Sequence, residues 1–509
     1  MSESISKSIS KSRSKTASTS TSTSGSDHTA INVAIVGHTN VGKTSLMRTL
    51  LRDDKFGEID DAAGTTRHVE KSAILCNGEE VLNLFDTPGL EDSSALLQVL
   101  EEMSASLETR LPVDLLRAFV LQADSDAESY AEFAQEAKVL RQAINSDVLL
   151  YIIDVREPLL GKYLDEIEIL SRAGKPILPV FNFIAGNSAA LKRWREQMTR
   201  FNLHAALEFD TVAFSFEAEK RLYQKLQSLL EPHYDSLQAL IDYRLQAWQD
   251  LTHAAARQVF QLLVQVAAYR FEVAVKNEIS AAQVTTMQDF VRRAEQRTLQ
   301  ALLKLFAFTQ LDVELQKLPV QNGRWQLDIF SPSLLKDFGL NAGATALKGA
   351  AAGAGIDLMV GGMSLGAATL LGAALGAGWA TVQRYQQELM AAIRGHQWLC
   401  VDNNTLALLY LRQQKLLRTL MQRGHAASNN LQLANLQPAN DEKQTLPKQT
   451  LPKQTLPKQW QKVIDTLRQK SEWQDASSVD ASVDAEYQHL QAQVVEWLLN
   501  NRDDSSQRA

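Results

Sequence analysis

Residues 31–44 read INVAIVGHTNVGKT, in which a short apolar run leads directly into the pattern GxxxxGKT from Gly37 to Thr44. In this pattern, glycines let the backbone wrap a phosphate with its N–H groups, and the helix that follows points its positive end at the phosphates. The lysine reaches the β- and γ-phosphates, and the hydroxyl residue binds Mg²⁺. The stretch therefore predicts a strand, a phosphate-binding loop and a helix. The nucleotide-binding residues that we expect from it are Gly37, Asn40, Val41, Gly42, Lys43, Thr44 and Ser45.

A second phosphate motif lies further along the chain. The apolar run that ends at Phe85 is followed by DTPG, from Asp86 to Gly89. An acidic residue at the end of a strand is the second Mg²⁺ position of such sites, and the glycine amide senses the γ-phosphate. DTPG favours a GTPase over a generic ATPase.

Between the two motifs stands GTTRH, which contains Thr66. Together, GHTNVGKTSL, GTTR and DTPGLED resemble the Era-like branch of the translation-factor-related GTPases. The resemblance implies that Thr66 closes on Mg²⁺ as switch I. Over about residues 30–425 the chain resembles a bacterial family in which an Era-like GTPase domain is joined to domain of unknown function 3482. That resemblance implies GTP binding without an established cellular role.

The rest of the N-terminal half fits a doubly wound, mostly parallel α/β sheet. Residues 147–155 and 175–183 are continuous apolar runs, as parallel strands buried on both faces require. The interval 91–146 is long for the connection after switch II, so we expect an insertion of one or two helices there. The predicted fold is an α/β P-loop GTPase domain followed by a mostly α-helical domain.

The base-recognition motif departs from the GTPase pattern NKxD. The chain has Asn182, Phe183, Ile184 and Ala185. Asn182 keeps the residue that braces the phosphate loop, and Phe183 offers a ring for stacking. Ala185 lacks the carboxylate that accepts from guanine, which predicts weakened base discrimination. The later segment that ends in Phe214 and Ser215 is a weak candidate for the remaining base-contacting loop.

Leu90 follows DTPG, so the glutamine that positions water in Ras-type enzymes is missing. Asn40 stands where potassium-activated relatives hold a monovalent cation, and we hypothesise K⁺-stimulated hydrolysis with Glu91 orienting the water. The alternative is that Asn40 only hydrogen-bonds within its loop. His38 and His68 have no ligand partner at metal-binding spacing, so we expect both to face solvent.

Helical periodicity dominates from Leu237 to Val266, in steps of three or four residues. We expect one long amphipathic helix that packs on helices around residues 282–307. A last helix is predicted behind Asp484, which is a suitable cap.

Within the Gly/Ala-rich segment 342–383, residues 358–383 carry no charged side chain. Such a run is long enough to span hydrocarbon, although Gly and Ala are only weakly hydrophobic. Three interpretations stay open: a tightly packed helical hairpin, a segment that inserts reversibly in membrane, and a permanent anchor. Basic residues that follow are candidates for anionic headgroups. They are Arg384, Arg394, Arg412, Lys415 and Arg418.

The 509 residues carry a formal net charge of -7, and Cys76 and Cys400 are the only cysteines. The charge gives no global reason for nucleic acid binding, so we expect no DNA partner and disfavour RNA. The cysteine count suits a reducing cytoplasm. We expect a disordered Ser/Thr-rich tail at 1–29, the GTPase domain at 30–232 and the helical domain at 233–425. A linker with KQTLP repeats at 426–460 and a helical tail at 461–509 complete the chain.

These patterns together predict an Mg²⁺-dependent cytoplasmic enzyme that hydrolyses GTP to GDP and phosphate. Its nucleotide state would control the helical domain, at the inner membrane surface if segment 342–383 enters lipid. The expected catalytic residues are Lys43, Thr66, Gly89 and Glu91, and the expected Mg²⁺ ligands are Thr44, Thr66 and Asp86. Two alternatives stay open: a ribosome- or RNA-associated assembly GTPase, and a nucleotide-binding scaffold with relaxed base specificity and little turnover. A homo-oligomer is also left open, and no protein partner is predicted.

Overall fold

The structure is a computed structural model of the whole chain. It describes residues 29–52, 69–106, 111–211, 215–273, 280–307, 320–321, 324–331, 334, 338, 355–360, 363–364, 397–422, 456–470, 473 and 484–500. Residues 1–28 of the Ser/Thr-rich tail, Thr66, most of the KQTLP repeats and most of segment 342–383 lie outside these residues.

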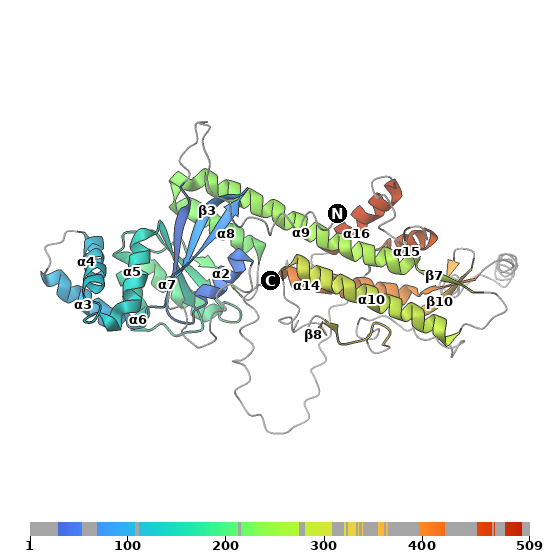
Figure 1. Ribbon diagram of the computed structural model, residues 1–509, viewed down its shortest axis with the longest axis horizontal. Coiled ribbons are helices and arrows are strands. Elements are labelled where there is room, and N and C mark those ends of the chain that lie inside the picture. Colours follow the sequence, from blue (N-terminus) through green and yellow to red (C-terminus); the bar gives the residue numbers. More distant parts are fainter. Residues whose placement is uncertain are drawn as a thin grey trace, which may run out of the picture.

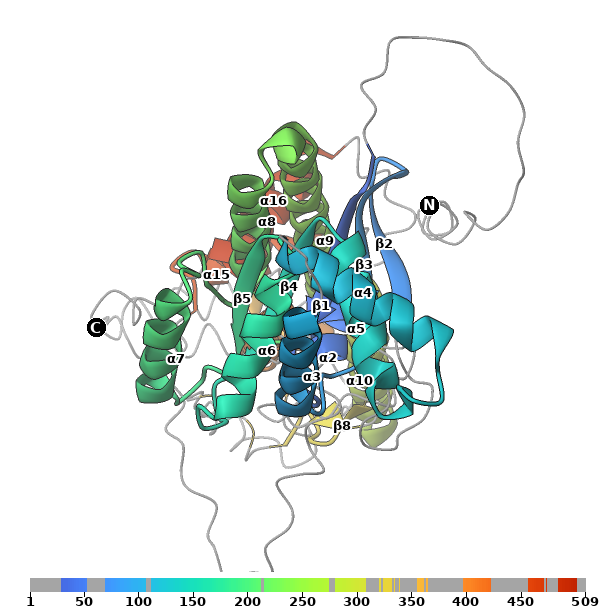
Figure 2. The ribbon, with the colours of Figure 1, turned by 90° about the vertical axis from the view of Figure 1, so that its left-hand side faces the viewer.

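A six-stranded sheet forms the centre of the N-terminal domain, in the order β2-β3-β1-β4-β5-β6. Every neighbouring pair is parallel except β2 and β3, which are antiparallel. The strands are β1 (Ile31–Val36), β2 (Glu70–Cys76), β3 (Glu79–Asp86), β4 (Val148–Asp154), β5 (Ile177–Asn182) and β6 (Leu207–Glu208). Figure 2 looks onto this domain, with β2 toward one side of the sheet and β5 toward the other. The predicted doubly wound, mostly parallel sheet is confirmed.

Helices cover both faces of this sheet because successive side chains of a strand point to opposite faces. In β4, Tyr151 and Ile153 belong to one core, and Leu150 and Ile152 to the other. The first core contains α3 (Ser93–Ser106), α4 (Pro112–Ser125), η1 (Ala131–Phe133), α5 (Ala134–Asn145), α6 (Gly161–Ser171) and α7 (Ser188–Arg200). The second contains α2 (Lys43–Leu51), α8 (Phe216–Leu229) and the start of α9 (Tyr234–Ala268), which follows η2 (Glu231–His233).

Helix α9 belongs to both domains. It has 35 residues and runs from the α/β domain into the helical domain (Figure 1). Leu237 and Ile241 are buried against the α/β sheet, whereas Val259 and Val266 lie in the core of the helical domain. The predicted long helix is confirmed. The expectation that its whole stripe packs on helices near 282–307 is wrong for its first two turns, which pack on β2, β3 and α8.

Of the described helices, four pack around the second half of α9 in the helical domain. They are α10 (Ala281–Leu305), α14 (Asn403–Gln422), α15 (Trp460–Gln469) and α16 (Ala485–Asn500). Asp484 caps α16, since its carboxylate accepts from the backbone N–H groups of Glu486 and Tyr487. Helices α15 and α16 share one core with α9 and α14. These two helices lie almost entirely in the stretch 461–509 that was expected as a helical tail, and their burial makes them part of the helical domain.

A small antiparallel sheet lies at the end of the helical domain farthest from the α/β domain (Figure 1). Its order is β11-β10-β12-β7, and a separate pair joins two shorter strands. The strands are β7 (Arg270–Val273), β8 (Val320–Gln321), β9 (Arg324–Trp325), β10 (Ile356–Val360), β11 (Met363–Ser364) and β12 (Gln397–Val401). The helical interpretations of segment 342–383 are therefore wrong for β10 and β11. Strand β10 pairs with β11 on one side and with β12 on the other, and these ladders take the backbone hydrogen bonds that a helix would use within itself.

Arg412 corrects a second expectation, because its side chain is only 1% exposed and cannot face lipid. Its Nε lies 3.3 Å from Glu295 Oε1, and its guanidinium lies 3.7 Å from the centroid of the Trp325 ring. Burial raises the pKa of Glu295 to about 7, against the opposing effect of Arg412. Among the described residues, none of the helices combines the length and the apolar character needed to cross a bilayer.

Candidate nucleotide-binding site

The phosphate loop leaves β1 and ends where α2 begins, and two of its positions need glycine. Gly37 and Gly42 have φ values of 138° and 99°, which L side chains rarely adopt. A Cβ at Gly37 would lie 2.7 Å from the carbonyl oxygen of Ile152, and one at Gly42 would lie 2.4 Å from Nδ2 of Asn182. The loop therefore packs directly on the ends of β4 and β5, and its N–H groups stand at a helix N-terminus that suits an anion.

Lys43 is the first residue of α2 and is buried. Its Nζ donates to the carbonyl oxygens of Gly37, at 3.0 Å, and His38, at 2.7 Å. Burial lowers the pKa of Lys43 to about 8, and the negative charges of Asp86 and Glu166 oppose that shift. The ammonium thus rests on carbonyls of its own loop, and a bound phosphate would offer it stronger, charged acceptors.

Thr44, the last residue of the phosphate-loop motif, contacts Asp86, the first residue of DTPG, although 42 positions separate them. Thr44 Oγ1 donates to Asp86 Oδ2 at 2.6 Å. Asp86 is 1% exposed, and its Oδ1 has no hydrogen-bond partner among the described residues. Burial raises the pKa of Asp86 to about 6. A hydroxyl beside an orphaned carboxylate oxygen is a hard-oxygen donor set that fits Mg²⁺. Thr66, the third expected ligand, lies outside the described residues.

Asn182 ties the phosphate loop to the base-side loop. Its Nδ2 donates to the carbonyl oxygen of Val41 at 2.9 Å, and its Oδ1 accepts from the N–H of Phe183 and from both the N–H and the hydroxyl of Thr211. Thr211 lies just before Phe214 and Ser215, the end of the segment that the sequence supports only weakly as the last base-contacting loop. Of that segment, residues 212–214 lie outside the described part.

Phe183 stands where GTPases carry the lysine of NKxD, and it adopts a φ of 55°. The guanidinium of Arg156 lies 3.8 Å from the centroid of its ring, while Asp154 pairs with that guanidinium at 2.6 Å. Ala185 is exposed and presents only a methyl group where the motif has a carboxylate. Aromatic and cationic surface thus replaces the usual lysine and aspartate beside Asn182.

The DTPG turn packs against the phosphate loop. A Cβ on Gly89 would lie 2.5 Å from Thr39 Cγ2, so only glycine fits there. Glu91 has an exposed side chain, and its N–H donates to the buried Glu136 at 3.3 Å. Asn40 is exposed, with a φ of 62°. Ser45 is half-buried, and its carbonyl oxygen accepts from the Thr49 hydroxyl.

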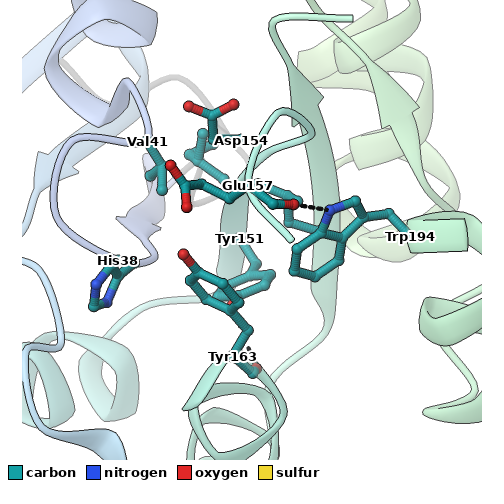
Figure 3. A pocket seen from close by; sticks show the side chains of 9 residues that line it. His38, Val41, Tyr151, Asp154, Glu157, Tyr163 and Trp194 are labelled. Carbon is teal, nitrogen blue, oxygen red and sulfur yellow. Dashed lines mark hydrogen bonds between the residues drawn. The ribbon is translucent and has the colours of Figure 1, made fainter. Parts of the chain in front are cut away.

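His38 corrects the expectation of a solvent-facing loop histidine. Its side chain is 15% exposed, and Nδ1 lies 2.9 Å from Oε1 of the fully buried Glu166. Figure 3 shows the His38 and Tyr163 side chains facing each other across part of a small pocket beside the loop. The pocket is lined by His38, Val41, Tyr151, Ile152, Ile153, Asp154, Glu157, Tyr163 and Trp194. His68, the other histidine, lies outside the described residues.

Sequence reasoning missed Glu166. One signal was present, because Tyr163, Glu166, Ile167 and Leu170 follow one another at helical spacing and place a carboxylate on the apolar face of α6. No comparable local pattern marks Thr211 or Arg156.

The sequence pattern of the family described as Domain of unknown function (DUF3482) matches residues 195–496, which is more than half of the chain. The chain belongs to the DUF3482 family. In this DUF3482 protein, the pattern described as 50S ribosome-binding GTPase matches residues 32–183, so the α/β domain is a P-loop GTPase domain. The DUF3482 match reaches beyond the expected limit near residue 425 and includes α15 and most of α16, in agreement with their burial.

Two curated GTPases resemble part of this DUF3482 protein. It is 30% identical to GTPase Der of Campylobacter concisus over 168 residues, 32% of this chain and 27% of that protein. It is 33% identical to the tRNA modification GTPase MnmE of Pediococcus pentosaceus over 148 residues, 28% of this chain and 31% of that protein. The match thus spans less than a third of either relative.

Two solved structures show a weak similarity to the chain. One is Era in complex with MgGDPNP and a fragment of 16S ribosomal RNA, at 23% identity and a TM-score of 0.25, covering 36% of this chain and 51% of that one. The other is the LeoA bacterial dynamin GTPase from ETEC, at 12% identity and a TM-score of 0.24, covering 92% and 86%. At these scores the similarity carries no argument about function.

Proposed function

We propose that this protein binds GTP with Mg²⁺ and hydrolyses it, and that its nucleotide state controls the helical domain. The observation that carries the second half is a buried contact between the phosphate-loop helix and α9. Arg52 directly follows α2, and its Nη2 lies 3.5 Å from Oε2 of Glu219, which is fully buried on α8. Arg244 of α9 approaches the other oxygen of the same carboxylate at 3.6 Å.

The contact continues in both directions. Toward the nucleotide site, Arg244 Nη2 donates to the carbonyl oxygen of Leu50 in α2 at 3.3 Å. Toward the helical domain, the Arg52 guanidinium lies 5.5 Å from the centroid of the Trp248 ring, which meets Phe306 at the end of α10. Residues 53–68, which hold Thr66, begin directly after Arg52. A change at switch I would therefore act on a residue that touches both α8 and α9.

For the chemistry, we propose that Lys43 and the loop amides bind the phosphates, and that the Gly89 amide reads the γ-phosphate. Asn182 holds the base-side loop. Thr44, Thr66 and Asp86 would hold Mg²⁺, which supplies charge neutralisation at the phosphates when bound. Glu91 would orient the attacking water.

Hydrogen exchange tests the proposed control of α9. We expect amides from Leu240 to Trp248 to exchange at least about threefold differently with a non-hydrolysable GTP analogue than with GDP, because local opening there depends on contacts to α2. Identical exchange throughout α9 and α10 in the two states would remove the coupling while leaving GTP hydrolysis in place.

Asn40 supports a proposal of K⁺-stimulated turnover. Its side chain is exposed and has no hydrogen bond to a described residue, so its amide oxygen is available to a monovalent cation. We expect turnover to rise about tenfold when K⁺ replaces Na⁺, since a cation beside the phosphates offsets transition-state charge. Asn40→Ala should lose the stimulation and keep the Na⁺ rate. Equal turnover in both salts would sink the idea.

Membrane association is proposed for the part of segment 342–383 that follows β11, residues 365–383. These residues carry no charge. Strand β11, which precedes them in the chain, belongs to the sheet at the end of the helical domain farthest from the GTPase domain (Figure 1). We expect cofractionation with phosphatidylglycerol vesicles that is stronger with the GTP analogue than with GDP.

A charge within the apolar run is the matched test of this surface. Leu371→Asp should weaken vesicle binding about 100-fold, because aspartate costs about 3 kcal/mol in hydrocarbon. Leu121→Asp, at a side chain 68% exposed on α4 of the other domain, should leave vesicle binding unchanged. Equal binding by the wild type and Leu371→Asp would contradict the proposal.

A further inference from the structure

His38 connects the phosphate loop to the turn that would read the γ-phosphate. Its Nδ1 lies 2.8 Å from the carbonyl oxygen of Leu90 and 2.9 Å from Glu166 Oε1. Its Nε2 lies 2.8 Å from the Nζ of Lys162. Leu90 directly follows Gly89, and it is fully buried.

These partners determine the tautomer of the imidazole. A carbonyl and a carboxylate can only accept, so Nδ1 must carry the proton, and an ammonium can only donate, so Nε2 must present its lone pair. Glu166 is itself fixed, since Tyr151 donates its hydroxyl to Oε2 at 2.8 Å. Burial, together with the charge of Glu166, raises the pKa of Tyr151 well above its ordinary value and keeps that hydroxyl a donor.

The turn from Asp86 to Leu90 is thus held on both sides of Gly89. Before it, the Thr87 hydroxyl donates to the carbonyl oxygen of Ile35 in β1 at 2.8 Å. After it, His38 holds the Leu90 carbonyl. Between these two anchors, Gly89 packs on Thr39 of the phosphate loop. Loss of the second anchor would let Gly89 move away from the phosphates without disturbing the phosphate loop itself.

We propose that His38 is a positioning residue for GTP hydrolysis: its Nδ1–H, oriented by Lys162 and Glu166, holds the Leu90 carbonyl and so fixes the Gly89 amide where the γ-phosphate is read. The proposal rests on GTP hydrolysis at this site. No residue of the cluster needs to touch the nucleotide through its side chain. The effect should therefore appear in kcat rather than in nucleotide affinity.

Two amide variants of His38 separate the effect of its hydrogen bond to Leu90 from the effect of side-chain size. In His38→Asn the amide nitrogen takes about the place of Nδ1 and can still donate to Leu90, whereas in His38→Gln it takes about the place of Nε2 and cannot. We expect His38→Gln to lower kcat about tenfold, with the Kd of a fluorescent GTP analogue unchanged within about twofold. His38→Asn should keep most of the wild-type kcat, and His204→Gln, at an exposed loop histidine, should keep all of it.

A third variant leaves His38 in place. Lys162→Met removes the donor to Nε2, so the ring is free to move its proton to that nitrogen, and kcat should fall about threefold. Equal kcat losses in His38→Asn and His38→Gln, or a loss confined to the Kd, would overturn the positioning role. A wild-type kcat in Lys162→Met would overturn the tautomer argument. A wild-type protein that does not hydrolyse GTP at all would overturn the underlying reaction instead.

Discussion

Replacing Lys43 by alanine is expected to abolish GTP hydrolysis and to weaken GTP binding at least about 100-fold. The buried ammonium now donates to two carbonyls of its own loop, and it would exchange them for phosphate oxygens. Two charge-assisted hydrogen bonds contribute about 3 kcal/mol, which corresponds to roughly that loss of affinity. A fluorescent GTP analogue measures the binding, and phosphate release measures the turnover.

Lys71→Ala is the matched control for this variant. Lys71 lies on β2, is 48% exposed and pairs with Glu80 on the neighbouring strand, so its loss should change neither binding nor turnover. The unfolding midpoint of Lys43→Ala should be close to that of the wild type, because removal of a buried ammonium with a lowered pKa relieves a desolvation cost. Full retention of binding and hydrolysis by Lys43→Ala would show that nucleotide does not bind at this loop.

The sequence was sufficient to place the parts of the candidate site that lie in short, contiguous motifs. Gly37 and Lys43 lie in the phosphate loop and at the start of α2, where the backbone geometry depends on nearby residues. Asp86 is the last residue of the buried strand β3. Their positions follow from local pattern and from the rule that parallel strands end at one edge of the sheet. Asn182 was found for the same reason, since it closes β5.

The parts that sequence reasoning missed depend on contacts between distant segments. His38 and Glu166 are 128 positions apart, and Thr211 reaches Asn182 over 29 positions, so neither pair produces a periodic signal. Strand β10 was misread because Gly/Ala-rich composition suggests close helix packing, whereas its actual partner is β12, about forty residues later in the chain. A hydrophobic stripe shows that a face is buried and does not show which partner covers it.

The hydrophobic stripe of helix α9 likewise does not show which partners cover it. Its stripe is continuous from Leu237 to Val266, but the partners change from the GTPase sheet to the helical domain along its length. Arg244 lies at the change, where it shares the carboxylate of Glu219 with Arg52. A buried ionic contact therefore joins α9, the helix that continues into the helical domain, to α2 and α8 of the GTPase domain.

Glu219→Ala is expected to destabilise the GTPase domain by about 3 kcal/mol, because it leaves Arg52 and Arg244 largely buried without their common counter-charge. It also removes the acceptor of the Tyr223 hydroxyl, which lies 2.9 Å away. The loss of unfolding free energy is measured by urea unfolding, with hydrogen exchange of the α/β core as the probe. Glu217→Ala, at an exposed position two residues earlier on α8, should change the free energy of unfolding by less than about 0.5 kcal/mol.

The milder variant Glu219→Gln distinguishes two roles of Glu219: transmission of the nucleotide state to α9, and stabilisation of the GTPase domain alone. The amide keeps the shape of the side chain and one acceptor but loses the charge that draws Arg52 and Arg244 together. In this variant GTP hydrolysis should persist, while the difference in α9 exchange between GTP-analogue and GDP states should shrink at least about threefold. If Glu219→Gln kept the full exchange difference, α9 would be responding through its apolar contacts with α8 alone. If both properties were lost together, Glu219 would be needed for the fold of the nucleotide site itself, since α2 contributes both Lys43 and the Leu50 carbonyl that Arg244 binds.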